Sequence, residues 1–266
     1  MALEHLSVSS FGMFSRCGEQ WRRRYIEGEV IPPGIAAHVG TGVHRAAEAC
    51  HKHKLETGET MRVSDMADAA ATAYDKALRN GVFFAPDEVD GAQKAMAQGK
   101  DNAVKLASLY GEQLAPKIDP MLVEERMMLN LPGVDLPIMA IVDLYTQDRA
   151  LRDLKTAGKS WTQSQADTSA QMTLYREAIK ESTGDYPASL GFDVLVNKKT
   201  PEVQQLATVR TGDDTELLAR GFRTMLKAVN AGVFLPAEPG AWVCSPKWCG
   251  YFGSCPYKQK AVQYFS

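Results

Sequence analysis

Two short runs of apolar and β-branched residues near the middle of the chain constrain its fold most. The first covers residues 136–145, the second covers residues 150–156, and the polar residues 147–149 lie between them. Runs of this length and composition, joined by a few turn-forming residues, predict the two antiparallel strands of a β-hairpin. Because side chains alternate along a strand, Asp153 and Lys155 would point to one face and Leu154 to the other.

The same hairpin predicts a cluster of charged side chains. Asp143 on the first strand needs only the right register to face Asp153 and Lys155 on the second. Two neighbouring carboxylates repel each other and resist joint ionisation unless a cation lies between them. A divalent ion such as Mg²⁺ or Mn²⁺ would turn this cost into a binding site. An Asp-x-Lys triplet also occurs by chance in many proteins as a surface ion pair, so the interpretation depends on the neighbouring segments.

Two helices beside the hairpin add candidate residues. The helix expected after the second strand carries Gln171 and Tyr175 one turn apart, so both polar ends can point toward the strands. Equally, Tyr175 can be a core aromatic with Gln171 as its solvated neighbour. Upstream, His44 lies in the first turns of an alanine-rich helix that opens at Gly40. A histidine at such a place is more often a cap or a core partner than a ligand.

The N-terminal segment interleaves aromatic residues with arginines. Its candidate phosphate-contacting residues are Arg22, Arg23 and Arg24, with Arg45 from the following helix. Aromatic and basic side chains together can stack on bases and bind phosphates, although three consecutive arginines most often form a solvated face. The formal net charge is −2, so binding to a polyanion would depend on local patches of this kind.

Cysteines at the two ends of the chain indicate a second metal centre. Cys244, Cys249 and Cys255 lie in a loop rich in proline and glycine, and Cys17 is the candidate fourth ligand. Disulfides are disfavoured because residues 1–20 have no signal-peptide pattern. Zinc and an iron–sulfur cluster both remain, since thiolate-rich sites bind either. We assign the fifth cysteine, Cys50, a structural role.

The hydrophobic pattern predicts helices first, then a central sheet, then further helices and a cysteine-rich tail. Helices are expected near residues 8–25, 40–57, 63–80, 87–113, 165–183 and 212–231, and strands near 121–130, 136–146, 150–156, 188–197 and 202–210. This order is typical of an α/β fold with a helical N-terminal half. No apolar run is long enough to span a bilayer, so we expect an intracellular, cytoplasmic protein with no membrane partner.

Taken in order, these segments resemble the RecB-type branch of the PD-(D/E)XK nuclease superfamily, which includes CRISPR-associated exonucleases and many phage exonucleases. The matching segments are a serine-rich start with a cysteine and an arginine-rich helix at 7–25, a glycine-rich helix start with a histidine at 40–44, the acid Asp143, the D-x-K-T strand at 153–156 and the Q-x-x-x-Y helix at 171–175. The resemblance covers nearly the full chain. Ala140 departs from it, because the family usually has glycine there.

The resemblance implies a fold and a function. The fold would be a restriction-endonuclease-like α/β core, with a central mixed sheet flanked by helices, a helical N-terminal half and an iron–sulfur C-terminal loop. Residues 1–266 would form one nuclease domain: a helical part at 1–115, a catalytic core at 116–231 and a cluster-binding tail at 232–266. The function would be metal-dependent exonucleolytic cleavage at DNA ends in recombination, repair or phage DNA processing. A phage-encoded protein of this type would act in the host cytoplasm.

Alternative functions are a CRISPR-adaptation nuclease and a non-catalytic DNA-end-binding subunit. Partners would be DNA and a recombinase, a single-strand-binding protein or a helicase.

The resemblance also implies roles for single residues. Mg²⁺ or Mn²⁺ would be held by Asp143, Asp153, the backbone carbonyl of Leu154 and His44. Lys155 would act on the attacking water or the developing charge, and Gln171 and Tyr175 would position the phosphate or the water. Related iron–sulfur nucleases hold a [4Fe-4S] cluster with one N-terminal and three C-terminal cysteines, here Cys17, Cys244, Cys249 and Cys255. The first C-terminal gap is longer than the usual C-x-x-C, which leaves Zn²⁺ as the alternative. We expect Glu124 and Glu125 to form a solvated strand face rather than to supply extra carboxylates.

Overall fold

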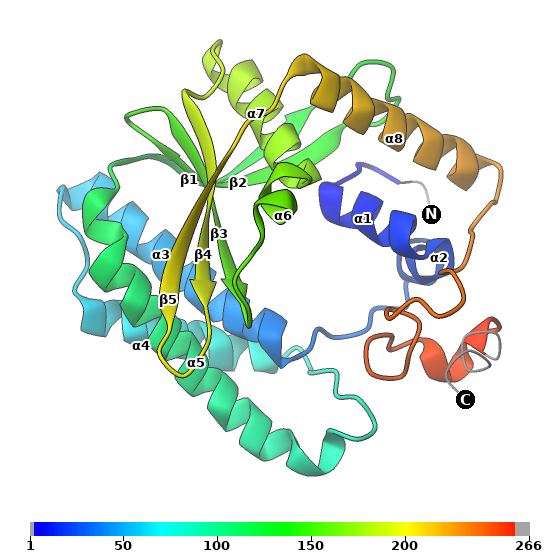
Figure 1. The fold of residues 1–266 in the computed structure, drawn as a ribbon, viewed down its shortest axis with the longest axis horizontal. Helices are drawn as coiled ribbons and strands as arrows, with labels where there is room; N and C mark the ends of the chain where they lie inside the picture. Colours follow the sequence, from blue (N-terminus) through cyan, green and yellow to red (C-terminus); the bar gives the residue numbers. More distant parts are fainter. Residues whose placement is uncertain (1–2, 259–266) are drawn as a thin grey trace.

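A computed structural model describes residues 3–258 and has a five-stranded sheet at its centre (Figure 1). The strands are β1 (Pro120–Leu129), β2 (Ile138–Thr146), β3 (Ala150–Ala157), β4 (Ser189–Val196) and β5 (Glu202–Thr208), and they lie in this order across the sheet. Only β3 and β4 pair in parallel, so the sheet is mixed. The predicted hairpin of β2 and β3 is confirmed, with Arg149 in the left-handed region (φ 63°) at its turn.

Helices cover both faces of the sheet. On one side lie α3 (Ile35–Thr57), α4 (Val63–Leu78) and α5 (Ala92–Gln113). On the other lie α1 (Val8–Arg16), α2 (Gly18–Tyr25), α6 (Gln163–Asp167), α7 (Ala170–Thr183) and α8 (Gly212–Asn230). The parallel β3–β4 pair needs a crossover connection, and α6 and α7 supply it. The α/β fold with a helical N-terminal half is therefore as predicted.

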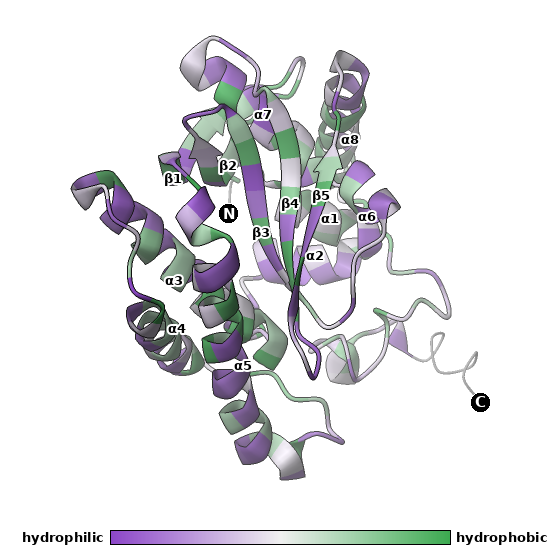
Figure 2. Ribbon diagram, turned by 60° about the vertical axis from the view of Figure 1, so that its left-hand side comes forward, coloured by the Kyte–Doolittle hydropathy of each residue, from purple (hydrophilic) through white to green (hydrophobic). Residues whose placement is uncertain are grey.

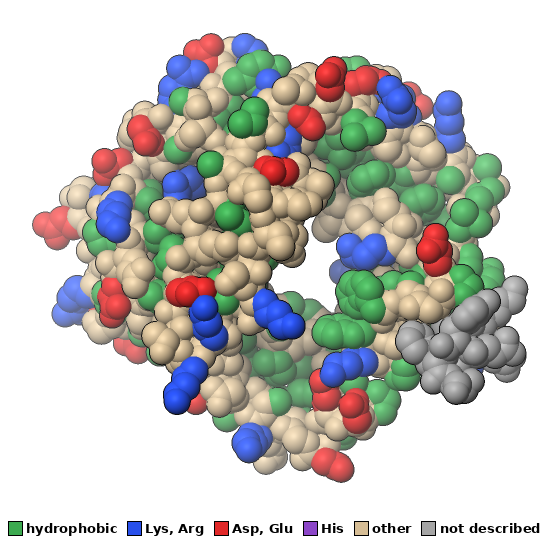
Figure 3. All heavy atoms as spheres, viewed as in Figure 1, with side chains coloured by type: hydrophobic (Ala, Val, Ile, Leu, Met, Phe, Trp, Pro, Cys, Tyr) green, Lys and Arg blue, Asp and Glu red, His purple; other side chains and the backbone are tan. Residues whose placement is uncertain are grey.

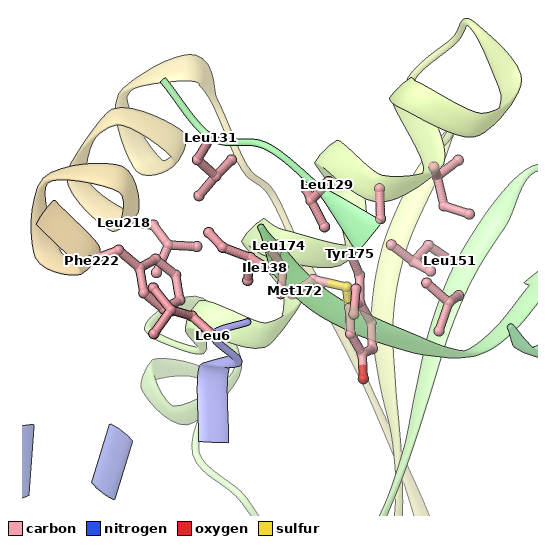
Figure 4. Close-up of a cluster of buried hydrophobic side chains, with 14 of the residues drawn as sticks. Leu6, Leu129, Leu131, Ile138, Leu151, Met172, Leu174, Tyr175, Leu218 and Phe222 are labelled. Atoms are coloured by element: carbon pink, nitrogen blue, oxygen red, sulfur yellow. The ribbon is translucent and has the colours of Figure 1, made fainter. Parts of the chain in front are cut away.

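Each face of the sheet has its own hydrophobic core. The core beneath α7 and α8 includes Leu6, Ile138, Leu151 and Phe222 (Figure 4). The core beneath α3, α4 and α5 is built from their inward residues, and Figure 2 shows hydrophobic and hydrophilic residues alternating along these helices. Such an amphipathic pattern buries one side of each helix and leaves the other in water. Among the helices within residues 3–258, none is long and apolar enough to cross a membrane.

The N-terminal helix predicted over 8–25 is two helices that meet at Cys17. Ser7 begins α1 through a capping box with Ser10, as the serine-rich sequence predicts. Cys17 has an extended backbone (φ −163°, ψ 103°), and its Sγ accepts a hydrogen bond from the Gln20 N–H at 3.4 Å, which caps α2. The hydrophobic periodicity continues across this break because both helices bury apolar residues in the same core. The periodicity alone therefore did not reveal the break at Cys17.

The two ends of the chain meet beside α2. The Gly18 N–H donates to the Leu235 carbonyl at 2.7 Å, and a Cβ on Gly18 would lie 2.9 Å from the Leu235 backbone. Arg23 Nη2 donates to Ser254 Oγ at 2.8 Å, and its guanidinium lies 5.1 Å from the centre of the Tyr251 ring. We call residues 232–258 the tail. The space-filling view shows an opening through the molecule between these joined ends and the body of the sheet (Figure 3), named here the central opening.

Candidate active site

The pairing between β2 and β3 stops where the charged residues begin. Backbone partners are recorded only for Tyr145 with Leu151 and for Leu144 with Arg152. At the next position Oδ2 of Asp143 accepts a hydrogen bond from the Leu154 N–H at 3.0 Å. A side chain thus takes the place of a backbone acceptor, and the regular pairing of the two strands ends there.

Three potential metal ligands converge at this point. His44 Nδ1 lies 3.5 Å from Oδ2 of Asp143 and 3.8 Å from Oε1 of Glu124. One ligand atom from each of the three side chains lies within 4.8 Å of the others. They come from α3, β2 and β1, so the packing of α3 on the sheet assembles the group. Two carboxylates and an imidazole form a donor set suited to Mn²⁺ or Mg²⁺.

Sequence reasoning missed Glu124. The register pairs Val123 with Leu144 and Glu125 with Val142, so Glu124 lies opposite Asp143. Its backbone is in the left-handed region (φ 51°), which is uncommon for a residue with a side chain and is concentrated at functional sites. The prediction that both glutamates lie on a solvated strand face is therefore wrong for Glu124, whereas Glu125 is exposed as predicted. Aligning the strands expected near 121–130 and 136–146 in antiparallel register would have revealed that Glu124 lies opposite Asp143.

The other four candidate side chains form a continuous chain of contacts. Lys155 Nζ lies 2.6 Å from Oδ2 of the fully buried Asp153 and donates to Gln171 Oε1 at 2.8 Å. Gln171 Nε2 donates to Tyr175 Oη at 2.6 Å. Gln171 and Tyr175 share one face of α7, as their spacing predicts, and that face turns toward β3. The predicted residues on β3 and α7 are thus brought together.

Asp153 lacks the hydrogen bonds that a buried carboxylate normally has. Oδ1 has no partner within the described residues, and neither oxygen accepts a well-aligned hydrogen bond. A buried carboxylate without such partners is strongly disfavoured unless it is protonated or bound to a cation. The unsatisfied Oδ1 of Asp153 therefore indicates that a cation would fit beside this carboxylate.

The pKa values of the acidic and basic groups at this site are shifted by burial and by the neighbouring carboxylates. Burial, with a further contribution from the Asp153 carboxylate, raises the pKa of Asp143 to about 7. Burial also raises the pKa of Asp153, although Lys155 opposes the shift. For His44 burial lowers the pKa, but the neighbouring Glu124 and Asp143 carboxylates outweigh it and the net shift is upward. Burial raises the pKa of Tyr175, so its phenol stays neutral and can both donate and accept hydrogen bonds.

Most of the candidate DNA-contacting arginines have carboxylate partners. Arg22 pairs with Glu19 at 2.8 Å and with Glu27 at 2.6 Å, and Arg45 pairs with Glu48. Arg23 pairs with Glu29 at 2.9 Å besides its contacts with the tail. Arg24 lies over the Tyr25 ring, 5.8 Å from its centre, and has no ion pair among residues 3–258. Arg24 is therefore the one of the four whose charge no described carboxylate neutralises.

The four candidate cluster ligands line one small cavity between α2 and the tail. Cys17, Cys244, Cys249 and Cys255 all border it, while Cys50 is buried in the core beneath α3. All five are free thiols. Burial raises the pKa of Cys244 and Cys249, and the neighbouring cysteines of the cavity raise it further. In the described part of the chain no three of these sulfurs lie within 4.8 Å of one another.

Comparison with known proteins agrees with this geometry. Residues 5–259 match the family model of the PD-(D/E)XK nuclease superfamily. The structure of a candidate exonuclease from Eubacterium rectale is similar in fold, with a TM-score of 0.56 and 15% identity over 91% of this chain and 86% of that chain. A second structure, described as SSO0001, has 13% identity over 97% of this chain and 88% of its own, but its TM-score of 0.40 is too low for a structural conclusion. No curated protein matches the sequence significantly.

Proposed function

Because this chain belongs to the PD-(D/E)XK nuclease superfamily, whose members are divalent-metal-dependent nucleases, we propose that it is a DNA exonuclease of the RecB type. It would hydrolyse phosphodiester bonds at DNA ends in recombination, repair or phage DNA processing. The observation that carries the proposal is Asp153, a fully buried carboxylate with an unsatisfied oxygen, in the Asp153-Leu154-Lys155 segment beside Asp143.

The cation would be held by His44, Glu124, Asp143 and Asp153. The Leu154 carbonyl is a further ligand in this proposal: Leu154 donates its N–H toward Asp143, and the N–H and C=O of a strand residue point to the same side. The imidazole of His44 favours Mn²⁺ over Mg²⁺, since nitrogen ligands suit the transition metal better. When bound, the cation would lower the pKa of a water molecule and neutralise charge on the phosphate.

The remaining side chains would orient the reacting groups. Lys155 carries a compact positive charge that can stabilise the charge developing on the phosphate during attack. Gln171 accepts a hydrogen bond from Lys155 and donates one to Tyr175, so it fixes where the ammonium group lies. The neutral phenol of Tyr175 can position the water or a phosphate oxygen through its remaining hydrogen-bonding capacity.

The cysteine cavity would hold a [4Fe-4S] cluster. What supports a shared metal centre is that all four candidate ligands, one from the N-terminal helices and three from the tail, border this one cavity. Four thiolates bind either an iron–sulfur cluster or Zn²⁺, so Zn²⁺ stays the alternative. The cluster would join α2 to the tail within one nuclease domain.

Cleavage assays with the purified protein test the function. We expect it to degrade end-labelled linear DNA with Mn²⁺ or Mg²⁺ and to leave covalently closed circular DNA intact. Asp153→Asn and Lys155→Met should each lower the rate by about 100-fold or more. Asp185→Asn, which removes an exposed carboxylate far along the chain, is the matched control and should keep the activity. Wild-type rates in the Asp153 and Lys155 variants would refute the assignment of the site, and cleavage of closed circles would refute the exonuclease.

A further inference from the structure

Two tryptophans of the tail are turned toward solvent. Trp242 is 63% exposed and Trp248 is 56% exposed, whereas Trp21 is fully buried in the core. The two exposed rings meet edge to face, with centroids 5.5 Å apart and an interplanar angle of 88°. The ammonium group of Lys247 lies 5.9 Å from the centre of the Trp248 ring. Exposed aromatic rings gathered in one place indicate a surface that contacts a ligand or a partner.

The loop that carries these rings is held in a fixed shape. Ser245 Oγ donates to the Trp242 carbonyl at 3.0 Å, and the Trp248 N–H donates to the Ser245 carbonyl at 3.1 Å. These bonds close a turn between the two tryptophans. The contacts of Gly18 with Leu235 and of Arg23 with Ser254 tie the flanking segments to α2. The rings are therefore presented by a preorganised loop, which lowers the entropic cost of binding.

The surroundings of the rings combine apolar and charged groups. Trp242 borders a groove of about 1090 Å³ between α1, α8 and the tail, whose lining is mostly apolar and also includes three arginines and three carboxylates: Arg16, Arg210, Arg220, Asp167, Asp214 and Glu238. In Figure 3 lysine and arginine side chains gather at the rim of the central opening. The strand β3, which carries Asp153 and Lys155, ends at that opening, and the tail lies across it (Figure 1). A strand of DNA crossing the opening could therefore contact both the tail and the strand that carries the candidate active-site residues.

We propose that Trp242 and Trp248 form a stacking platform for the unpaired bases of single-stranded DNA, with Lys247 contacting the phosphates. This inference rests on the proposed nuclease function and adds the form of its substrate. Every base has a flat π face, so stacking on aromatic rings binds single strands regardless of sequence. Bases inside a duplex already stack on one another and cannot reach the rings. The platform thus favours an unpaired end over a blunt duplex, and the Lys247 ammonium group beside the rings favours DNA over an apolar protein partner.

Binding to labelled oligonucleotides in EDTA, where no cleavage can occur, tests this platform. Fluorescence anisotropy should show that Trp242→Ala and Trp248→Ala each weaken binding to a single-stranded oligonucleotide by about tenfold. Binding to a blunt duplex should change by less than about twofold. The matched control is Tyr186→Ala, which removes an aromatic residue that is also partly exposed and beside a cation but lies in the loop between α7 and β4. It should bind both DNAs as the wild type does.

An abasic oligonucleotide separates stacking from charge. The wild type should bind it about as weakly as the Trp242→Ala/Trp248→Ala double variant binds the normal strand, and the double variant should not distinguish the two strands. Equal losses on normal and abasic strands would overturn the proposal. Undiminished binding of the double variant would also overturn it and would favour a protein partner for the rings. If the wild type cleaves DNA while the tryptophan variants bind normally, only the platform fails; if the wild type cleaves nothing with any metal, the proposed function fails.

Discussion

Glu124 illustrates how one backbone angle changes what a side chain can do. Its φ of 51° turns the carboxylate toward His44 and Asp143, whereas the next residue, Glu125, faces water. Such a conformation costs about 1–3 kcal/mol for a residue other than glycine and persists where the surroundings enforce it. The strain is consistent with a residue held for binding rather than for stability.

Replacement of this carboxylate should weaken metal binding. We expect Glu124→Gln to reduce the affinity for Mn²⁺ by about tenfold, because it removes one anionic ligand from the group of three. Isothermal titration calorimetry at constant pH measures the change. Glu125→Gln is the matched control, since it removes the same charge from the exposed neighbour. Equal losses in both variants would mean that general electrostatics, not ligation, accounts for the effect.

A second residue-scale prediction concerns His51. This buried histidine lies 2.6 Å from Tyr110 Oη through Nε2, and burial lowers its pKa from 6.5 to about 4. A depressed histidine pKa means that the unfolded chain binds the proton first. The contribution of neutral His51 to the free energy of unfolding is therefore fully present above pH 6.5. It falls by up to about 3 kcal/mol as the pH falls toward 4.

Chemical denaturation at pH 7.5 and pH 4.5 checks the His51 effect. We expect the wild type to lose about 2–3 kcal/mol more than His51→Asn between these two pH values, because the variant has no imidazole to protonate. The exposed His5 provides the control, and His5→Asn should behave as the wild type. Parallel losses in the wild type and in His51→Asn would show that His51 does not titrate as described.

At the scale of elements, the close packing of α3 on α4 and α5 depends on a glycine. A Cβ on Gly42 would lie 2.9 Å from the Ala70 carbonyl oxygen and 3.2 Å from the Ala103 Cβ. Gly42→Ala should therefore lower the free energy of unfolding by about 1–3 kcal/mol, despite the better helix propensity of alanine. A Cβ on Gly12, inside α1, would lie 3.5 Å from Arg16 Nη1, an ordinary contact with the end of a flexible side chain, so Gly12→Ala should raise the free energy of unfolding by about 0.5–1 kcal/mol. Opposite signs in urea denaturation are the test, and stabilisation by both substitutions would contradict the packing.

Sequence periodicity predicted the elements well because most of them bury one regular face. The strands β2 and β3 and the helices α4 and α8 begin and end within about two residues of the expected positions, an error typical of boundary assignment. The break at Cys17 was not predictable in this way, since it interrupts hydrogen bonding without interrupting the hydrophobic pattern. Neither was Glu124, whose placement depends on the register between two strands. Local patterns determine elements, while a site assembled from α3, β1 and β2 depends on tertiary packing.

At the scale of the whole molecule, the cysteine cavity should connect metal content with the attachment of the tail. Protein purified without oxygen should be brown and contain about four irons per chain if the cavity holds a [4Fe-4S] cluster. Cys249→Ala should lose the iron and make the tail sensitive to limited proteolysis, because the ligands from α2 and the tail would no longer share a metal centre. Cys50→Ala is the control and should keep the iron, since Cys50 lies in a different core. Colourless protein with one zinc would refute the cluster.

The contacts between the N-terminal helices and the tail also affect the order in which parts of the fold can form during synthesis. Leu6 pairs beside Ile138, and Arg23 bonds to Ser254, 231 positions later in the sequence. At translation rates of about 5–20 residues per second, Arg23 waits roughly 10–50 s for its partner. The segments that form the sheet, up to Thr208, are therefore synthesised well before Ser254 is available. The nascent chain can pack the sheet first, and the contacts that join α2 to the tail form later.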